Sequence, residues 1–423
     1  AVSVPGCVDA WEKILDKFGV FSLDTVLAPA VDYAQAGFGV SEFTANSWKK
    51  SELKLSINGS CEFLTSGRAP RFGEKVELHQ LSRTLKGISE NGSSFFYEGI
   101  IPEKISSYVN KFSGWLCEED FAKHTSSWVN PIDSNYRGYD IWECPPNGQG
   151  VAALIALNII ENIDFSDSKI EPTLKLHYKI EAMKIAFADA LWYVADPEKF
   201  KIPIDELLSK SYAKQRFNDI KEDQANKDYS IGNFKQSGDT VYVSVIDENG
   251  NACSLINSLY EAFGTGLVVP DTGIVLHNRG ALFSTNREHP NFLAPSKRPY
   301  NTIIPGMITK NNNLVSSFGV MGGFQQPQGH LQVVSNMVDF GMNPQEALDY
   351  ERFRINLEDK ITYLEDSFNQ TVISGLKSKG HSVSLISGVN RGFFGGGQII
   401  NRNGEGILIG GSDSRKDGLS VSY

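Results

Sequence analysis

The sequence becomes clearly β-like at residues 240–252, which read Thr240-Val241-Tyr242-Val243-Ser244-Val245-Ile246-Asp247-Glu248-Asn249-Gly250-Asn251-Ala252. Many of the first seven residues are β-branched or aromatic, and such residues favour strands because they fit a pleated, half-buried surface. The Asn249-Gly250 pair predicts a tight hairpin turn, because both residues tolerate the positive φ that this turn needs. We therefore predict a strand that starts at Thr240 and a return strand over residues 252–259.

The part of the chain before this hairpin is largely helical in its pattern. Apolar residues recur at helical spacing, and Ser22 is a candidate N-cap for the second of the helices that we predict over 7–18, 21–36, 151–160 and 173–195. A polar, weakly patterned stretch over 220–238 is interpreted as an exposed connector that ends at Thr240.

Strands dominate the pattern after the hairpin. We predict them over 274–278, 303–309 and 314–320, with a late hairpin over 398–410. One helix interrupts them, because Asn343, Pro344 and Glu346 form the pattern of a capping box that starts a helix running to about residue 352.

Composition excludes several classes of protein. The chain of 423 residues carries 40 Lys and Arg against 50 Asp and Glu, and this net charge of −10 argues against a dedicated nucleic-acid binder. No apolar run reaches the roughly 20 residues of a membrane helix. Residues 1–6 lack the pattern of a signal peptide, so a cytoplasmic location is expected.

Neither the cysteines nor the histidines form a metal-binding pattern. The five cysteines are odd in number and contain no C-x-x-C pair, so we expect free, mostly buried thiols. The seven histidines are scattered singly, and no pair has ligand spacing. We therefore expect no metal.

Motifs for phosphate loops, serine-hydrolase elbows, zinc proteases and dinucleotide binding are absent. Thr240 has an alternative chemistry, because a threonine that becomes an N-terminus can use its own α-amino group as the base for its hydroxyl. The competing interpretation is that Thr240 simply favours a strand. Two glycine clusters also have two interpretations each: residues 319–324 as an oxyanion hole or a plain turn, and residues 263–266 as a close approach to a ligand or a bend.

Several motifs in register resemble the γ-glutamyltranspeptidase family. On the C-terminal side these are residues 240–252, Phe263-Gly264-Thr265-Gly266, Lys297-Arg298-Pro299, Met321-Gly322-Gly323 and Asp413-Ser414-Arg415-Lys416-Asp417-Gly418. On the N-terminal side they are Pro5-Gly6-Cys7-Val8-Asp9-Ala10-Trp11, Tyr136-Arg137-Gly138-Tyr139 and Pro145-Pro146-Asn147-Gly148-Gln149-Gly150. The resemblance spans nearly the whole chain.

This resemblance implies an α/β (α+β) fold of the N-terminal-nucleophile hydrolase type, a four-layer αββα sandwich. It implies a proenzyme that cuts itself between Asp239 and Thr240, giving a large subunit of residues 1–239 and a small subunit of residues 240–423 in one structural body. Ala1 aligns inside the family's large subunit, so the arginine that usually binds the donor carboxylate lies before the sequence given. The expected partners are a small amide substrate and the two subunits of the one precursor, with a homodimer as a further option. No cofactor, nucleic acid or membrane is expected.

The resemblance also assigns roles to single residues. Thr240 is similar to the nucleophile and general base, and Ser258 to a second hydroxyl that hydrogen-bonds it. The backbone N–H groups of Gly322 and Gly323 correspond to the oxyanion hole.

The residues expected to bind substrate are Asn301, Thr302, Tyr260 and Arg279. Asn301 and Thr302 stand where the transpeptidases have a serine pair on the substrate carboxylate. Leu282 falls where an Asp holds the α-ammonium of the glutamyl group, and Arg279 replaces a neutral contact nearby. These exchanges favour an anion over a zwitterion, because a buried ammonium without its carboxylate partner is costly.

The departures are typical of a transpeptidase-like branch of the family, which includes oxamate amidohydrolase. The leading hypothesis is an autoprocessing amidohydrolase or acyltransferase that cleaves a γ-glutamyl-like or small anionic amide through an acyl-enzyme on Thr240. A short stretch over 284–295 favours hydrolysis over transfer. The alternatives are a true γ-glutamyltransferase acting on glutathione, and an inactive binding protein on the same fold.

Overall fold

The chain folds into two compact units. The computed structural model describes residues 1–57, 61–227 and 239–423. Unit 1 comprises Ala1–Trp128 and Leu259–Ala281, and unit 2 comprises Val129–Ser258 and Leu282–Tyr423. Each unit therefore contains chain from both sides of the predicted cut between Asp239 and Thr240.

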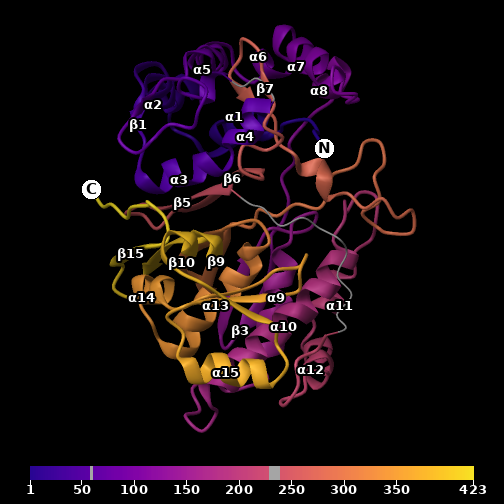
Figure 1. The fold of residues 1–423 in the computed structure, drawn as a ribbon, viewed down its shortest axis with the longest axis vertical. Coiled ribbons are helices and arrows are strands. Elements are labelled where there is room, and N and C mark those ends of the chain that lie inside the picture. Colours follow the sequence, from indigo (N-terminus) through magenta and orange to yellow (C-terminus); the bar gives the residue numbers. More distant parts are fainter. Residues whose placement is uncertain (58–60, 228–238) are drawn as a thin grey trace. The chain divides into compact units, whose positions relative to one another are not determined.

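Unit 1 is mainly helical, and its helices α2 and α5 pack side by side (Figure 1). Its elements are α1 (Cys7–Phe18), α2 (Leu23–Ala36), β1 (Phe38–Gly39), α3 (Glu42–Lys50), α4 (Glu52–Ile57), the 3-10 helix η1 (Cys61–Phe63), β2 (Lys75–Val76), α5 (His79–Asn91), α6 (Ser94–Tyr97), α7 (Ile100–Asn110), α8 (Glu118–Ala122), β7 (Val268–Val269) and β8 (Ile274–Val275).

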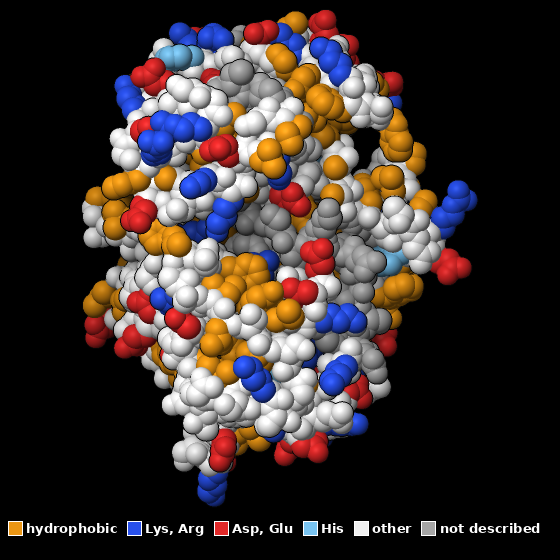
Figure 2. All heavy atoms as spheres, viewed as in Figure 1, with side chains coloured by type: hydrophobic (Ala, Val, Ile, Leu, Met, Phe, Trp, Pro, Cys, Tyr) orange, Lys and Arg blue, Asp and Glu red, His pale blue; other side chains and the backbone are white. Residues whose placement is uncertain are grey.

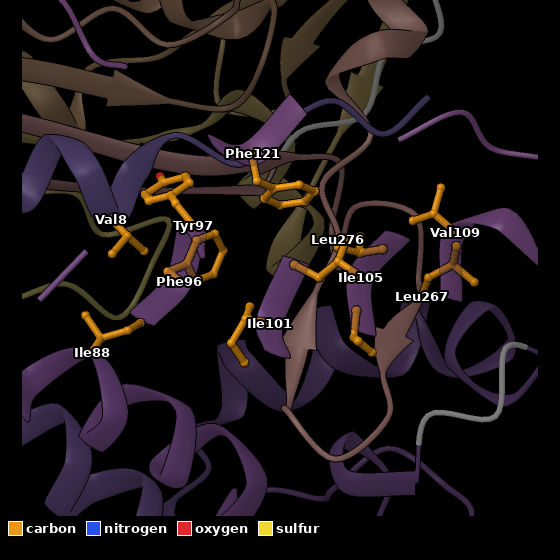
Figure 3. Close-up of a cluster of buried hydrophobic side chains, with 11 residues drawn as sticks. Val8, Ile88, Phe96, Tyr97, Ile101, Ile105, Val109, Phe121, Leu267 and Leu276 are labelled. Carbon is orange, nitrogen blue, oxygen red and sulfur yellow. The ribbon is translucent and has the colours of Figure 1, made fainter. Parts of the chain in front are cut away.

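The later segment of unit 1 supplies part of the unit's hydrophobic core. Leu267 and Leu276, which flank the β7–β8 hairpin, pack with apolar side chains from α1 and α5–α8 (Figure 3). The Leu276 N–H donates to the Leu267 carbonyl at 3.0 Å. Burying such side chains stabilises the unit by about 1.5–3 kcal/mol each. A cut at Thr240 would therefore leave Leu267 and Leu276 in a core built mostly from the other fragment.

Among its described residues, unit 2 combines helices with three sheets: a main sheet of six strands, the sheet β11-β12-β13 and the sheet β5-β6. Its elements are β3 (Ile132–Tyr136), β4 (Tyr139–Glu143), α9 (Gly150–Ile160), α10 (Pro172–Tyr193), α11 (Ile204–Leu207), α12 (Lys210–Asn218), β5 (Asp239–Ile246), β6 (Ala252–Tyr260), β9 (Gly306–Lys310), β10 (Asn313–Met321), α13 (Gln325–Phe340), α14 (Pro344–Asp349), β11 (Phe353–Ile355), β12 (Thr362–Glu365), α15 (Gln370–Ser378), β13 (Val383–Ile386), β14 (Gly396–Arg402) and β15 (Leu408–Ser412). Along the chain, β6 passes into unit 1 at Leu259 and the 3-10 helix η2 (Arg279–Leu282) returns to unit 2 at Leu282, while η3 (Gly388–Phe394) precedes β14.

The main sheet of unit 2 joins strands from both predicted subunits. Its order is β15-β14-β10-β9-β4-β3, and every neighbouring pair is antiparallel. Strand β4 pairs directly with β9, for example through Ile141 and Ile308. Helices α9 and α13 pack beside this sheet, and α10 packs on α9 (Figure 1).

A second sheet, made of β5 and β6, stacks on β10 of the main sheet. Successive side chains of a strand point to opposite faces, so β10 contacts two different layers. Phe318 packs against His330 of α13 on one face, with ring centroids 4.8 Å apart. On the other face Gly319 meets Tyr242 of β5, and a Cβ on Gly319 would lie 2.5 Å from that ring. Unit 2 is therefore layered as helices, main sheet and β5–β6 sheet.

Local predictions agree well with the structure. Helix α1 spans Cys7–Phe18 as predicted, α9 is buried along its whole length, and Asn343 and Glu346 form the predicted capping box. The hairpin turn places Gly250 at a φ of +84°. Ser22 occupies the N-cap position of α2 without a side-chain capping bond.

Two strand predictions were too long. Strand β9 begins at Gly306 and not at residue 303, because residues 301–304 bind elsewhere: the Ile304 N–H donates to Gln326 Oε1 at 3.0 Å. Strand β8 ends at Val275, because the next carbonyl, of Leu276, accepts from Thr265.

The surface carries both signs of charge. On the face shown in Figure 2, basic and acidic side chains are interspersed. The four cysteines with described side chains are free, but they are half-buried or exposed and not mostly buried as predicted. Within the described residues, the helices are too short or too polar to span a membrane.

Candidate functional site

Thr240 lies at the start of β5 with its hydroxyl on Ser258 of β6. Its side chain is buried, and Oγ1 donates to Ser258 Oγ at 3.1 Å. A serine hydroxyl is not a base at neutral pH, so this contact orients the Thr240 oxygen without deprotonating it. Asp239 is the first residue of the same strand, and most of the predicted connector, residues 228–238, lies outside the described residues.

The stacking of β5 on β10 relates Thr240 to the glycine pair Gly322-Gly323. On β5 and β10, Ser244 Oγ lies 2.7 Å from Ser317 Oγ. Two residues earlier on β5, Tyr242 packs over Gly319, which is two residues later on β10. Continuing this alternation by two residues predicts that Thr240 lies near Met321, the last residue of β10. On this prediction the nucleophile and the oxyanion donors belong to neighbouring ends of two stacked strands.

Gly322 and Gly323 connect β10 to α13 with backbone angles that favour glycine. Their φ values are +129° and +63°. The Gly322 and Gly323 carbonyls accept from the N–H groups of Gln325 and Gln326, both at 3.1 Å, so these carbonyls face into the first turn of α13. The pair therefore forms a strand-to-helix turn. Its role as an oxyanion hole stays a prediction, and the turn geometry is compatible with it.

The loop that carries Asn301 and Thr302 is bound to the loop before α9. The Asn301 N–H donates to the Asn147 carbonyl at 2.8 Å, and the Gln149 N–H donates to the Asn301 carbonyl at 3.0 Å. Thr302 is fully buried, and its carbonyl accepts from Gln149 Nε2 at 2.7 Å. The Asn301 Oδ1 atom accepts from the Ile303 N–H at 3.3 Å.

Gln149 is a residue whose importance the sequence did not indicate. Its Nε2 atom also donates to the Gly323 carbonyl at 2.9 Å, and its Oε1 accepts from the Tyr300 hydroxyl at 3.1 Å. The sequence identified it only as part of a turn motif. Its partners are more than 150 residues away along the chain, so no local pattern could have revealed them.

Tyr260 and Arg279 belong to unit 1, whereas Leu282 and the other predicted site residues belong to unit 2. Arg279 is 8% exposed, and burial lowers the pKa of its guanidinium to about 10, an effect that Tyr260 opposes. A group with this pKa is still cationic at neutral pH. Tyr260 is buried with a φ of +78°, a rare conformation for a residue with a side chain. Unit 1 therefore carries a buried cation next to a strained tyrosine.

The cluster at residues 263–266 packs against its own chain. A Cβ on Gly264 would lie 2.4 Å from the Leu276 carbonyl oxygen, and Thr265 donates to that same carbonyl. The close approach that the glycines permit is therefore to residues 276–277 of unit 1.

A fully buried hydrogen-bonded pair, His330 and Glu143, supports β10 just before the glycine pair. His330 Nδ1 lies 2.5 Å from Glu143 Oε1, and His330 Nε2 accepts from the Val320 N–H at 3.3 Å. Burial raises the pKa of Glu143, and the hydrogen bond with His330 opposes that rise. These contacts tie β4, β10 and α13 together.

Two histidines that are far apart in sequence meet in unit 2. His177 Nδ1 lies 2.8 Å from His381 Nε2, and Glu181 completes a buried group whose atoms could hold a metal ion. The sequence predicted no such pairing of histidines. Lys184 already supplies a cation there, because its Nζ lies 2.8 Å from Glu181 Oε1 and 3.4 Å from His381 Nδ1. Hydrogen bonding accounts for the group without a metal.

The hydrogen bonds of this group run in one direction and end on the connector. Lys184 donates to His381, His381 Nε2 donates to His177, and His177 Nε2 donates to the Lys221 carbonyl at 2.8 Å. The Lys221 carbonyl can only accept, so the proton of neutral His177 is on Nε2 and its Nδ1 accepts. His381 must then carry its proton on Nε2, and its Nδ1 accepts from Lys184. Both histidines must be neutral for the chain of bonds to exist.

We expect this group to make the protein sensitive to acid. Burial is the main cause that lowers the pKa of both His177 and His381, and Lys184 also lowers that of His381. A histidine with a lowered folded pKa stabilises the fold above its unfolded pKa of about 6.5, and this contribution is lost as the pH falls below that value. Replacing His381 by Leu should therefore cost less stability in acid. The gap in unfolding free energy between wild type and His381→Leu should shrink by about 2 kcal/mol from pH 7.5 to pH 5.

Urea unfolding at each pH measures that gap. Leu376→Ala is the control, because Leu376 is a fully buried residue of α15 without a titratable group. Its gap from wild type should stay constant with pH. A constant gap for His381→Leu as well would contradict the assignment of neutral histidines.

Two surface hollows, one in each unit, contain none of the predicted site residues. One, of about 410 Å³, is lined by Lys13, Lys17, Trp128 and their neighbours in unit 1. Another, of about 510 Å³, lies around Phe340 and Tyr350 in unit 2. The hydrogen bond between Thr240 and Ser258 lies outside both of them.

Comparison with known proteins identifies relatives along the whole chain. Residues 1–423 match the family model described as Gamma-glutamyltranspeptidase. The chain is 37% identical to the glutathione hydrolase-like YwrD proenzyme of Bacillus subtilis, covering all of this chain and 80% of that protein. It is 30% identical to the oxamate amidohydrolase proenzyme of Klebsiella pneumoniae, covering all of this chain and 81% of that protein.

A solved structure has the same fold. The crystal structure of cephalosporin acylase from Bacillus halodurans matches with a TM-score of 0.91 and 39% identity, over all of this chain and 78% of that one. The predicted mixed α/β fold of the N-terminal-nucleophile hydrolase type is therefore confirmed.

Proposed function

Because the chain belongs to the γ-glutamyltranspeptidase family, we propose that it cuts itself between Asp239 and Thr240 and then hydrolyses a small anionic amide through an ester on Thr240. The hydrogen bond between Thr240 and Ser258 is the observation that carries this proposal. The names of the relatives support it, since they are proenzymes of a glutathione hydrolase-like protein and an amidohydrolase.

The first reaction rearranges the chain at Thr240. The Thr240 hydroxyl attacks the Asp239 carbonyl carbon, and the oxyanion that forms needs N–H donors of the kind that Gly322 and Gly323 offer. The C–N bond then breaks, the nitrogen takes up the hydroxyl proton, and an ester joins Asp239 to the Thr240 oxygen. Water hydrolyses this ester and leaves a free amino group on Thr240.

The second reaction uses the amino group that the first one releases. An α-amino group has a pKa near 8, so about a tenth of it is unprotonated at pH 7, and this form can accept the proton of the Thr240 hydroxyl. The oxygen attacks the substrate amide, the amine leaves with that proton, and water hydrolyses the resulting ester to a carboxylate. The same oxyanion donors serve both reactions.

Charge favours an anionic substrate. By resemblance Arg279 replaces a neutral contact of the substrate site, and a cationic side chain at that position favours a carboxylate over an ammonium group. Leu282, which is fully buried, offers no charge to an ammonium group. An amide with a carboxylate but no α-ammonium, such as oxamate, therefore fits these residues better than a γ-glutamyl group does.

A panel of amides tests the substrate class. Oxamate and succinamate carry a carboxylate without an ammonium, glutathione carries both, and isobutyramide carries neither. We expect kcat/KM for the best anionic amide to exceed that for glutathione at least about tenfold, with the acid product measured by mass spectrometry. The Arg279→Met variant should lower kcat/KM for the anionic amides by about 10- to 100-fold, the usual worth of a charged hydrogen bond. Turnover of isobutyramide should not change in this variant.

A preference for glutathione would instead support a true γ-glutamyltransferase or glutathione hydrolase. Some other group of the wild-type chain would then have to bind the ammonium, because Leu282 stands where the transpeptidases have an Asp.

A further inference from the structure

We propose that Gln149 is a positioning residue that holds the oxyanion donors and the substrate loop in one fixed arrangement. This inference rests on the proposed function, because Gly323 and Thr302 matter only if they act on a substrate. The Gln149 side chain makes no hydrogen bond to Thr240, so the proposed reaction does not by itself assign it a role.

The orientation of the Gln149 amide is determined by its partners. Two carbonyl oxygens, of Thr302 and Gly323, lie 2.7 and 2.9 Å from one end, so that end must be the NH₂ group. The other end accepts from the Tyr300 hydroxyl at 3.1 Å. Both N–H bonds and the oxygen are therefore engaged, and the side chain has no exposed surface.

Gln149 also differs from an ordinary residue at its position in a helix. It is the N-cap of α9, where a polar side chain commonly accepts from the helix's own N–H groups, yet it makes no such bond. Its side chain reaches instead to two loops that lie more than 150 residues further along the chain. The side chain at this N-cap therefore binds two distant loops and does not cap the helix.

The glycine pair needs such an anchor. Gly322 and Gly323 have no side chains to pack, and their positive φ values lie in regions that glycine leaves easily. A displacement of about 1 Å in a catalytic group can reduce the rate about 100-fold. Because one nitrogen holds both Gly323 and Thr302, the donors for the oxyanion cannot move independently of the substrate loop.

The backbone keeps the Asn301 loop on the loop before α9 without this side chain. The Asn301 N–H donates to the Asn147 carbonyl and the Asn301 carbonyl accepts from the Gln149 N–H, and neither bond involves the Gln149 amide. Substitution at Gln149 should therefore disturb alignment more than folding.

Two variants of similar size remove the bonds in different ways. Gln149→Met removes both donors at all pH values, and we expect kcat to fall about 10- to 100-fold while KM changes less than about threefold. Gln149→Glu replaces the donor by a carboxyl group between two carbonyl oxygens, an environment that favours the protonated form. Only the protonated form can donate, so kcat of Gln149→Glu relative to wild type should rise several-fold from pH 9 to pH 6. The ratio for Gln149→Met should stay flat.

Gln332→Met provides the matched control. Gln332 is also buried, and its amide also bonds two carbonyls, of Gln328 and Phe353, at 2.8 and 3.1 Å. We expect its melting temperature to fall as much as that of Gln149→Met, with kcat within about twofold of wild type. Equal kcat losses in the two variants would overturn the proposal, since loss of stability would then explain both.

The rate of self-cleavage separates this proposal from the proposed function. Cleavage of freshly translated chain, followed by intact mass, should slow about 10- to 100-fold in Gln149→Met and stay near wild type in Gln332→Met. A wild-type chain that cuts itself but hydrolyses none of the amides would contradict the proposed substrate class and leave this comparison valid. Wild-type rates of cleavage and turnover in Gln149→Met would contradict only the role of Gln149.

Discussion

Thr240→Ala is expected to remain one chain of 423 residues, whereas the wild type yields fragments of residues 1–239 and 240–423. Alanine has no hydroxyl to attack the Asp239 carbonyl, and without the cut no α-amino group forms to act as a base. Amide hydrolysis should fall at least about 10⁴-fold, as it does when the nucleophile of such a mechanism is removed. Intact-mass spectra of freshly expressed protein, with turnover of the amide panel, measure both effects.

Two further variants make this result specific. Thr240→Ser keeps the hydroxyl and should still be cut. Ser258→Ala removes the partner that lies 3.1 Å from the Thr240 oxygen, and we expect cleavage to be slowed and not abolished. An uncut wild-type chain would remove the base that the mechanism requires and favour the alternative of an inactive binding protein. A Thr240→Ala chain that is still cut would place the nucleophile elsewhere.

The cut itself should leave the fold intact. Both units contain residues from both fragments, since residues 259–281 complete the core of unit 1 and β4 pairs with β9 in unit 2. The fragments are thus held by buried apolar surface and by a shared sheet. Loss of activity in the uncut Thr240→Ala would accordingly report on the missing hydroxyl and amino group and not on a different fold.

Arg415→Leu should destabilise the protein by about 3–5 kcal/mol, the usual cost of leaving buried charges without their partner. Arg415 is 2% exposed, and its guanidinium bonds both oxygens of Glu365 at 2.7 and 2.5 Å. It also lies 3.2 Å from Asp413 and donates to the Leu348 carbonyl at 2.6 Å. Leucine fills much of the space but leaves two buried carboxylates with less positive charge around them.

The matched control uses another arginine of the same network. Arg391 bonds Glu365 at 2.7 Å, but its side chain is 34% exposed, so Arg391→Leu should cost only about 1 kcal/mol. Urea unfolding at pH 7 measures both changes. Equal losses in the two variants would mean that burial of Arg415 does not determine the strength of its ion pairs.

Arg415 belongs to a motif, residues 413–418, whose contacts could not be predicted from the resemblance to the family. Residues 413–418 match the family, yet their sequence does not show what they contact. In the structure Asp413 pairs with Arg352 at 2.6 Å as well as with Arg415. Burial by itself would raise the pKa of Asp413, but the two arginines hold it below its usual value. The motif therefore ties the end of the chain to the segments after α13.

Local order could be predicted from the sequence because its causes lie within a few residues. The Asn343 cap bonds N–H groups two and three residues away, the Asn249-Gly250 turn needs only the φ freedom of its own residues, and α9 follows from an unbroken apolar run. The family and its fold were also predicted, because several motifs occur in the right order. The roles of Thr240, Ser258 and the glycine pair stay predictions that the experiments above address.

The tertiary structure was needed wherever partners are distant in the chain. Gln149 acts on residues more than 150 positions away, and His177 meets His381 across 204 positions. Strand β9 starts later than its β-like sequence predicts because residues 301–304 bond to the loop before α9 and to the first turn of α13. Such contacts depend on how whole elements pack, and each residue type is compatible with many partners until packing selects one. The sequence alone therefore predicted the family, the local elements and the candidate nucleophile, and only the packed chain revealed what aligns them.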